Sequence, residues 1–129
     1  MTRSPEPVFD ASLGDSIPRL SLVFPAFNEA ENLPFLLESA TKIGDQLGVP
    51  FEIVIVDDGS GDDSAAVLDH WRAQDPRIRS VHHATNRGYG AALRAGLREA
   101  RGELVFFSDA DLQFELSEIA ALLAHADDV

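Results

Sequence analysis

The sequence predicts an α/β fold in which a parallel β-sheet is flanked by helices. Short apolar segments, often rich in β-branched residues, alternate with segments whose apolar residues recur at helical spacing. Such alternation is typical of a parallel sheet whose strands are joined by right-handed helical crossovers. The chain has 129 residues, of which 45 % are hydrophobic, and this is enough for one buried core.

Four segments are expected to form strands, and each of them is short. They are Leu20–Phe24, which Pro25 ends, Phe51–Val56, the weaker Ile78–His83, and Leu104–Phe107. The second and the fourth are almost continuously apolar, which is typical of strands that are covered on both faces.

Four segments with helical periodicity follow these strands. They are Asn28 to about Gln46, Asp62–Gln74, Gly90–Ala100 and Ser117–Ala124. Polar residues that can accept bonds from free N–H groups stand at three of the starts, namely Asn28 or Glu29, Asp62 or Asp63, and Ser117. In the second helix, the residues expected to face the core are Ala66, Val67, Leu68 and Trp71.

The chain is expected to consist of a leader and one domain. Residues 1–18 combine prolines with scattered charges and predict a flexible leader without the apolar centre of a secretory signal. Residues 19–129 predict a single Rossmann-like domain. No fifth strand follows the last helix, so we expect this domain to be truncated at its C-terminal end.

The composition excludes several classes of protein. The net charge is −12 and Lys42 is the only lysine, so no basic stripe can bind a nucleic-acid backbone. The absence of cysteine excludes disulfides and thiolate metal sites. No apolar run approaches the roughly 20 residues that span a bilayer. The expected location is the cytoplasm, with membrane association through segments outside this chain left open.

Carboxylates are concentrated where the predicted strands end. In open α/β sheets ligands bind beyond the carboxyl ends of the strands, and this edge carries Glu29, Asp57, Asp58, Asp109 and Asp111. Two unit charges about 4 Å apart repel by about 4 kcal/mol at an effective dielectric of about 20. Carboxylates gathered here therefore need a cation or hydrogen-bond donors between them.

A divalent cation is expected at the end of the last strand. Asp109 and Asp111 are two residues apart, so a turn can direct both toward one ion, and Gln113 offers a further oxygen. Oxygen ligands of this kind suit Mg²⁺, which is typically bound by one or two carboxylates together with substrate phosphates. The alternative interpretation is that these aspartates only end strands and cap helices.

Four motifs in order resemble those of glycosyltransferase family 2, in particular its dolichol-phosphate mannosyltransferase-like branch. The motifs are Pro25-Ala26-Phe27-Asn28-Glu29, Val56-Asp57-Asp58-Gly59-Ser60, Asn86-Arg87-Gly88-Tyr89-Gly90-Ala91-Ala92-Leu93 and Asp109-Ala110-Asp111-Leu112-Gln113. The resemblance covers about residues 20–123 and implies the N-terminal, nucleotide-binding part of a GT-A fold. The segment Phe114–Leu116 departs from the usual continuation of that branch, so the acceptor is the least defined part of the resemblance.

The resemblance also implies roles for individual residues. Asp57 would accept hydrogen bonds from the nucleotide base, while Pro25, Phe27 and Glu29 would line the base and ribose pocket. Asp109, Asp111 and Gln113 would hold Mg²⁺ or Mn²⁺ on the diphosphate, and the two aspartates would be the catalytic residues. The remaining residues expected to contact the nucleotide are Asp58, Asn86, Gly88 and Ala110.

The activity that the resemblance implies is inverting, metal-dependent transfer of a hexose. The donor would be a nucleotide-diphosphate sugar of the GDP-mannose or UDP-glucose type, and the acceptor a polyprenyl or dolichyl phosphate at a membrane surface. One alternative is a catalytically incomplete nucleotide-binding module. Another is a phosphoacceptor receiver domain, which would require a lysine on a later strand, and no lysine follows Lys42.

Two further features have open interpretations. His82 and His83 lie at the end of a predicted strand and are expected to be structural, although imidazoles also bind metals. Arg87 is the one basic residue expected at the acidic edge, where either a phosphate contact or solvent exposure would suit it.

Overall fold

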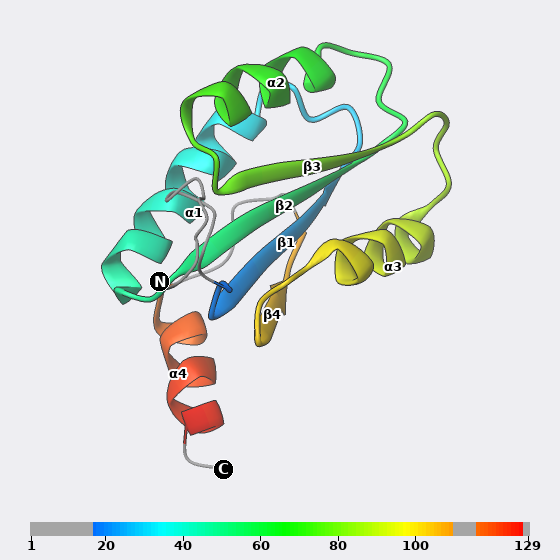
Figure 1. Ribbon diagram of the computed structural model, residues 1–129. Coiled ribbons are helices and arrows are strands. Elements are labelled where there is room, and N and C mark those ends of the chain that lie inside the picture. Colours follow the sequence, from blue (N-terminus) through cyan, green and yellow to red (C-terminus); the bar gives the residue numbers. More distant parts are fainter. Residues whose placement is uncertain (1–16, 110–115, 128–129) are drawn as a thin grey trace, which may run out of the picture.

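The computed structural model describes residues 17–109 and 116–127. They form a four-stranded, wholly parallel sheet with the strand order β3-β2-β1-β4 (Figure 1). The strands are β1 (Leu20–Ala26), β2 (Phe51–Asp58), β3 (Ile78–His83) and β4 (Leu104–Phe107). The predicted fold class is confirmed, and β3 and β4 have the predicted bounds.

Helices cover both faces of this sheet. They are α1 (Leu33–Leu47), α2 (Ser64–Gln74), α3 (Tyr89–Glu99) and α4 (Leu116–Asp127). Figure 1 shows α1 and α2 on one side of the sheet and α3 on the other. None of the helices within the described ranges combines the length and apolar character needed to cross a bilayer.

The main core lies between the sheet and α1, α2 and α4. Alternate residues of the two central strands face it, because successive side chains of a strand point to opposite faces. Its fully buried members include Leu22, Phe24, Ile53, Leu37 and Ile119. On the other face α3 packs closely, since a Cβ at Gly96 would lie 2.5 Å from Val23 Cγ1. The two central strands are therefore held from both sides.

The prediction that Pro25 ends the first strand is wrong, because Pro25 pairs with Val56 inside β1. The carbonyl of Val23 accepts a bond from Ser108 N, so the backbone polar groups of Val23, and those of Pro25 two residues on, face the β4 side. The last β1–β4 pair is Val23 with Phe107. The missing N–H of Pro25 therefore faces a side on which no β4 pairing is lost.

The first two helices begin later than predicted. Asn28 has φ 55°, in the left-handed region, and α1 begins only at Leu33 after a turn in which Glu29 O accepts from Asn32 N. In the second case α2 begins at Ser64 and Asp63 is its cap residue, without a side-chain capping bond, while the carboxylate of Asp62 accepts from Ser64 N at 3.0 Å. The cap residue lies outside the helix itself.

Four smaller expectations also need correction. Ala66 is exposed, although Leu68 is buried and Trp71 packs against the core. The third helix begins at Tyr89, one residue before Gly90, and the last begins at Leu116, which places Ser117 inside it. The strand β4 is half-buried and not covered on both faces, because it is an edge strand in the described sheet.

Candidate functional site

A pocket of about 340 Å³ lies at the carboxyl ends of the strands. Its lining comes from the ends of β1, β2 and β4 and from the first residues around α3. The lining residues are Pro25, Ala26, Phe27, Glu29, Asp58, Asn86, Gly88, Tyr89, Ala92 and Asp109. The structure thus brings Pro25, Phe27, Glu29, Asp58, Asn86, Gly88 and Asp109 together, all of them predicted site residues.

The other predicted site residues are not among the described lining residues of this pocket. Asp57 is buried and is not one of the lining residues of this pocket, although it precedes the lining residue Asp58 in the chain. Ala110, Asp111 and Gln113 lie outside the described residues. Tyr89 and Ala92 line the pocket and were not predicted to do so. The aromatic residue that opens a helix directly after Gly88 was the available signal for Tyr89.

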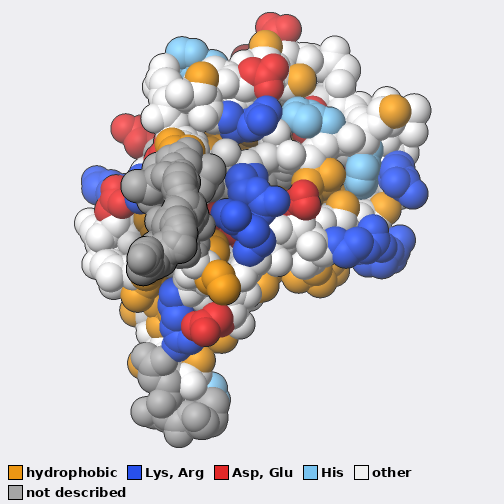
Figure 2. Space-filling view, viewed as in Figure 1, with side chains coloured by type: hydrophobic (Ala, Val, Ile, Leu, Met, Phe, Trp, Pro, Cys, Tyr) orange, Lys and Arg blue, Asp and Glu red, His pale blue; other side chains and the backbone are white. Residues whose placement is uncertain are grey.

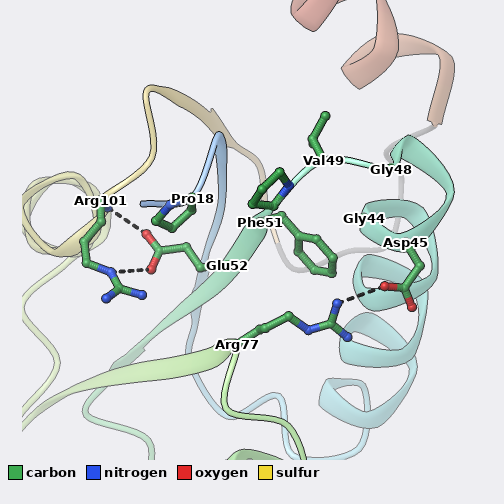
Figure 3. Close-up of a pocket in the computed structure, with 10 residues that line it drawn as sticks. Pro18, Gly44, Asp45, Gly48, Val49, Phe51, Glu52, Arg77 and Arg101 are labelled. Atoms are coloured by element: carbon green, nitrogen blue, oxygen red, sulfur yellow. Dashed lines mark hydrogen bonds and ion pairs between the residues drawn. The ribbon is translucent and has the colours of Figure 1, made fainter. Parts of the chain in front are cut away.

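A slightly larger cavity, about 370 Å³, lies at the opposite end of the sheet (Figure 3). Phe51, Arg77 and Arg101 are among its lining residues. Its charged groups are paired with one another: Arg77 Nη1 lies 2.9 Å from Asp45 Oδ1, and Arg101 Nε lies 3.1 Å from Glu52 Oε1. Because ligands of open α/β sheets bind at the carboxyl ends, the pocket of about 340 Å³ is the candidate site.

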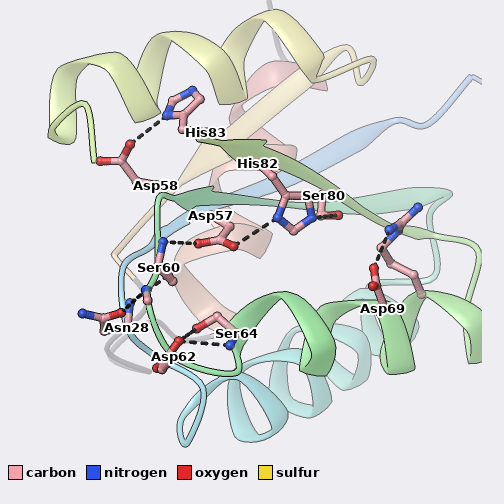
Figure 4. Close-up of polar contacts among 12 residues, drawn as sticks. Asn28, Asp57, Asp58, Ser60, Asp62, Ser64, Asp69, Ser80, His82 and His83 are labelled. Atoms are coloured by element: carbon pink, nitrogen blue, oxygen red, sulfur yellow. Dashed lines mark hydrogen bonds and ion pairs between the residues drawn. The ribbon is translucent and has the colours of Figure 1, made fainter. Parts of the chain in front are cut away.

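Asp58 braces the wall of the candidate site. Its Oδ1 accepts from His83 Nδ1 at 2.7 Å and from Arg87 N at 3.0 Å, and its Oδ2 accepts from Gly88 N at 2.9 Å (Figure 4 shows the histidine contact). Burial alone would raise the pKa of Asp58, but these donors outweigh it and lower the pKa below its ordinary value. Asp58 is thus an ionised brace between β2, β3 and the start of α3.

Asp57 is held in a similar way by a different loop. Its Oδ1 accepts from Ser60 N at 3.1 Å, and His82 Nδ1 lies 3.0 Å from its Oδ2 (Figure 4). The register of the parallel strands places Asp57 opposite His82 and Asp58 opposite His83. The structural role predicted for the two histidines therefore takes the form of two carboxylate–imidazole pairs.

The loops after β1 and β2 are tied to each other. Asn28 N donates to Ser60 Oγ at 2.9 Å, and Asn28 Oδ1 accepts from Gly61 N at 2.8 Å. Ala30 N also donates to Asp62 Oδ2, at 3.2 Å. These two bonds account for the left-handed backbone of Asn28, because in that conformation both its N–H and its side chain bond to the loop after β2.

Two aromatic side chains are exposed at the pocket. Phe27 and Tyr89 both line it, and Tyr89, at 58 % exposure, packs edge-on against Phe107 with 5.7 Å between ring centroids. Exposed aromatic faces beside a polar pocket suit the stacking of a planar ring, such as a nucleobase.

The charged side chains in the described lining of the pocket are all acidic. Glu29, Asp58 and Asp109 line it, and no lysine or arginine does so among the described residues. Figure 2 shows basic side chains spread over the face in that view, with some of them over α3. The side chain of Arg87 is exposed and Arg87 is not a lining residue. An anionic ligand would therefore need a cation to bind here.

Within the part of the chain that the structure describes, no group of three or more histidines and acidic residues could hold a metal ion. Glu29 receives its own donor, Asn32 Nδ2 at 2.8 Å, and Asp57 and Asp58 are held as described. Of the predicted metal ligands, Asp109 alone is described, and it is exposed at the pocket, two residues after the end of β4.

A parallel sheet with a pocket beyond the carboxyl ends of its strands is typical of α/β domains that bind ligands at that edge. The sequence model of glycosyl transferase family 2 matches residues 21–128. The chain therefore belongs to glycosyl transferase family 2, which confirms the predicted family.

The curated relatives support the same assignment. The undecaprenyl-phosphate 4-deoxy-4-formamido-L-arabinose transferase of Pectobacterium carotovorum subsp. carotovorum (strain PC1) is 42 % identical over 114 residues, which are 87 % of this chain and 35 % of the relative. The enzyme of the same name from Enterobacter sp. (strain 638) is 40 % identical over 116 residues, 88 % of this chain and 35 % of the relative. The chain thus spans about a third of the length of these relatives.

Solved structures of glycosyltransferases share the fold. The mannosyltransferase PcManGT from Pyrobaculum calidifontis, in complex with GDP-Man and Mn²⁺, superimposes with a TM-score of 0.69 at 28 % identity, over 84 % of this chain and 32 % of that one. Staphylococcus aureus TarS 1-349 in complex with UDP-GlcNAc also gives a TM-score of 0.69, at 26 % identity, over 85 % of this chain and 31 % of that one. The predicted GT-A architecture is confirmed.

Proposed function

We propose that this chain is the donor-binding part of a glycosyltransferase that uses a nucleotide-diphosphate sugar. The observation that carries the proposal is the pocket at the carboxyl strand ends, which joins exposed aromatic faces to carboxylates without a basic residue in its described lining. A base can stack on such a surface, whereas a diphosphate needs a cation to lie beside it.

The residues at the end of β4 fit a divalent cation. Asp109 stands exposed at the pocket, and Asp111 and Gln113 follow it in the sequence with further oxygen atoms. Carboxylate and amide oxygens are hard ligands that suit Mg²⁺ or Mn²⁺. We propose that these three residues hold the ion, which when bound would neutralise the charge that develops on the leaving diphosphate.

The remaining lining residues would bind the nucleoside. In this proposal Pro25, Phe27 and Glu29 form the base and ribose wall, and the Asn86 to Gly88 loop closes the other side. Asp57 would reach the base with lone pairs that Ser60 N and His82 do not occupy. Asp58 lines the pocket while it braces that loop. Ala110 would lie beside the metal ligands.

The proposed acceptor is a polyprenyl phosphate at a membrane surface, and the proposed donor is of the GDP-mannose or UDP-glucose type. The relatives are named as undecaprenyl-phosphate transferases, and the solved neighbours hold GDP-Man or UDP-GlcNAc. A phosphate acceptor is already anionic, so inverting attack on the sugar needs no strong general base. Because the chain spans about a third of its relatives, a module that binds the nucleotide without transferring sugar is the second candidate.

Substituting Asp111→Ala is expected to weaken Mn²⁺-dependent binding of GDP or UDP at least about tenfold, because the ion would lose a charged ligand. Calorimetric titration of each nucleotide, with Mn²⁺ and with a chelator, measures this effect. Adding a polyprenyl phosphate and the corresponding nucleotide sugar then separates transfer from binding alone.

Asp69→Ala is the matched control, because Asp69 is an exposed aspartate on α2 that pairs only with its neighbour Arg72 among the described contacts. Its nucleotide affinity should equal that of the unsubstituted protein. Binding that does not depend on Mn²⁺, or undiminished binding by Asp111→Ala, would contradict the proposed metal site.

A further inference from the structure

His83 forms a buried pair with Asp58 at the edge of the candidate site. Strand register places the two residues opposite each other at the ends of β3 and β2. Their side chains are 8 % and 6 % exposed, and His83 Nδ1 lies 2.7 Å from Asp58 Oδ1. An ionised carboxylate can only accept, so His83 Nδ1 carries the proton of this hydrogen bond.

Asp58 connects His83 to the backbone at the wall of the pocket. The same carboxylate accepts from the backbone N–H groups of Arg87 and Gly88. Gly88 has φ +97° and is the residue directly before α3, so these two bonds define how the chain turns into the helix. Gly88 and its neighbours Asn86 and Tyr89 line the pocket, whereas His83 does not.

We propose that His83 is a positioning residue for nucleotide binding: it fixes Asp58, and Asp58 fixes the Asn86 to Gly88 loop against which the nucleotide lies. This inference rests on the proposed function, because it takes the pocket to be the nucleotide site. Among the described hydrogen bonds, His83 is joined to the lining through Asp58, so it acts through that carboxylate and not by direct contact with a ligand.

The neighbouring pair holds a different loop. His82 is 37 % exposed and its partner Asp57 is not a lining residue. The Asp57 carboxylate holds Ser60 N of the loop after β2, and His82 Nε2 lies 3.0 Å from Ser80 Oγ. Of the two imidazoles, His83 is therefore the one whose carboxylate bonds directly to the loop before α3.

Two substitutions separate the hydrogen bond from the bulk of the side chain. Asn Nδ2 and His Nδ1 are both bonded to Cγ, so His83→Asn keeps a donor near the same place, while His83→Leu removes it. We expect His83→Leu to raise the Kd of GDP or UDP with Mn²⁺ about tenfold and His83→Asn to raise it less than about threefold. If the leucine variant does not fold, His83→Ala replaces it as the variant without a donor.

Amide hydrogen exchange at Arg87 and Gly88 gives a readout that does not depend on nucleotide. Both amides should exchange at least about tenfold faster in His83→Leu than in His83→Asn, because their acceptor is no longer fixed. His70→Leu is the control, since His70 is exposed on α2 and its described contact is with Gln74. It should leave both the affinity and the exchange unchanged.

The outcomes distinguish this inference from the proposed function. Failure of the unsubstituted protein to bind either nucleotide with Mn²⁺ would overturn the proposed function, and the inference with it. If the unsubstituted protein binds, then normal affinity in His83→Leu, or equal losses in the leucine and asparagine variants, overturns the positioning role. Exchange at Gly88 that is unchanged without the donor would overturn the brace itself.

Discussion

Gly59→Ala is expected to lower the free energy of unfolding by about 4 kcal/mol, from the sum of a left-handed backbone and overpacking. Gly59 has φ +76°, and a Cβ there would lie 2.3 Å from both Asn86 N and Thr85 C. These are backbone atoms of the loop after β3, so no side-chain rotation can relieve the contact. Urea unfolding of the two proteins at neutral pH measures the difference. We also expect weaker nucleotide binding, since Asn86 lines the pocket.

Two other glycines serve as controls that separate the cost of the left-handed backbone from the cost of overpacking. Gly48 has φ +72° but no atom within 4 Å of an added Cβ, so Gly48→Ala should cost only the backbone part, about 1 to 2 kcal/mol. Gly61 has open space and no left-handed backbone, so Gly61→Ala should be close to neutral. If Gly59→Ala cost no more than Gly48→Ala, the close approach of the two loops would not be present in solution.

The arrangement of the site could be predicted because it follows from topology. The predicted bounds of β3, the weaker strand, and of the apolar β4 match the observed ones, and helices between strands implied a parallel sheet. In a parallel sheet every strand ends at the same edge. Asp58, Asn86 and Asp109 follow or end different strands, and this alone places them around one pocket.

The sequence could not predict features that depend on contacts between distant segments. Pro25 was predicted to end the strand because proline has no N–H to donate. Whether a hydrogen bond is lost there depends on how far the neighbouring strand β4 extends, which the sequence around Pro25 does not show. His82 and His83 carried no local signal, since their partners become visible only when the register of β2 and β3 is known. Glu52 interrupts an apolar strand and would ordinarily face solvent, yet its partners are 27 to 49 positions away.

Glu52→Gln is expected to cost about 3 kcal/mol of unfolding free energy, because it breaks a buried ionic network by neutralising one member. Glu52 is 1 % exposed, and its carboxylate accepts from Ser21 Oγ at 2.6 Å, Arg101 N at 2.7 Å and Arg79 Nη1 at 2.9 Å. Figure 3 shows it between β2 and Arg101. Glutamine has the same size, but its Nε2 would meet donors where an acceptor is required. Urea unfolding at pH 7 measures the loss.

The pH dependence tests whether the charge of Glu52 is responsible. Burial alone would raise its pKa, but bonds from Ser21, Arg101 and Arg79 lower it below the ordinary 4.5. The stabilisation is therefore complete above about pH 4.5 and lost as pH falls through the folded-state pKa. The difference in unfolding free energy between Glu52→Gln and the unsubstituted protein should thus shrink in acid.

The control is Glu103→Gln, which removes the charge of a 62 % exposed partner of Arg19 and should cost less than about 1 kcal/mol. Equal costs for the two substitutions, or a pH-independent cost at Glu52, would mean that the network does not hold the strands through charge.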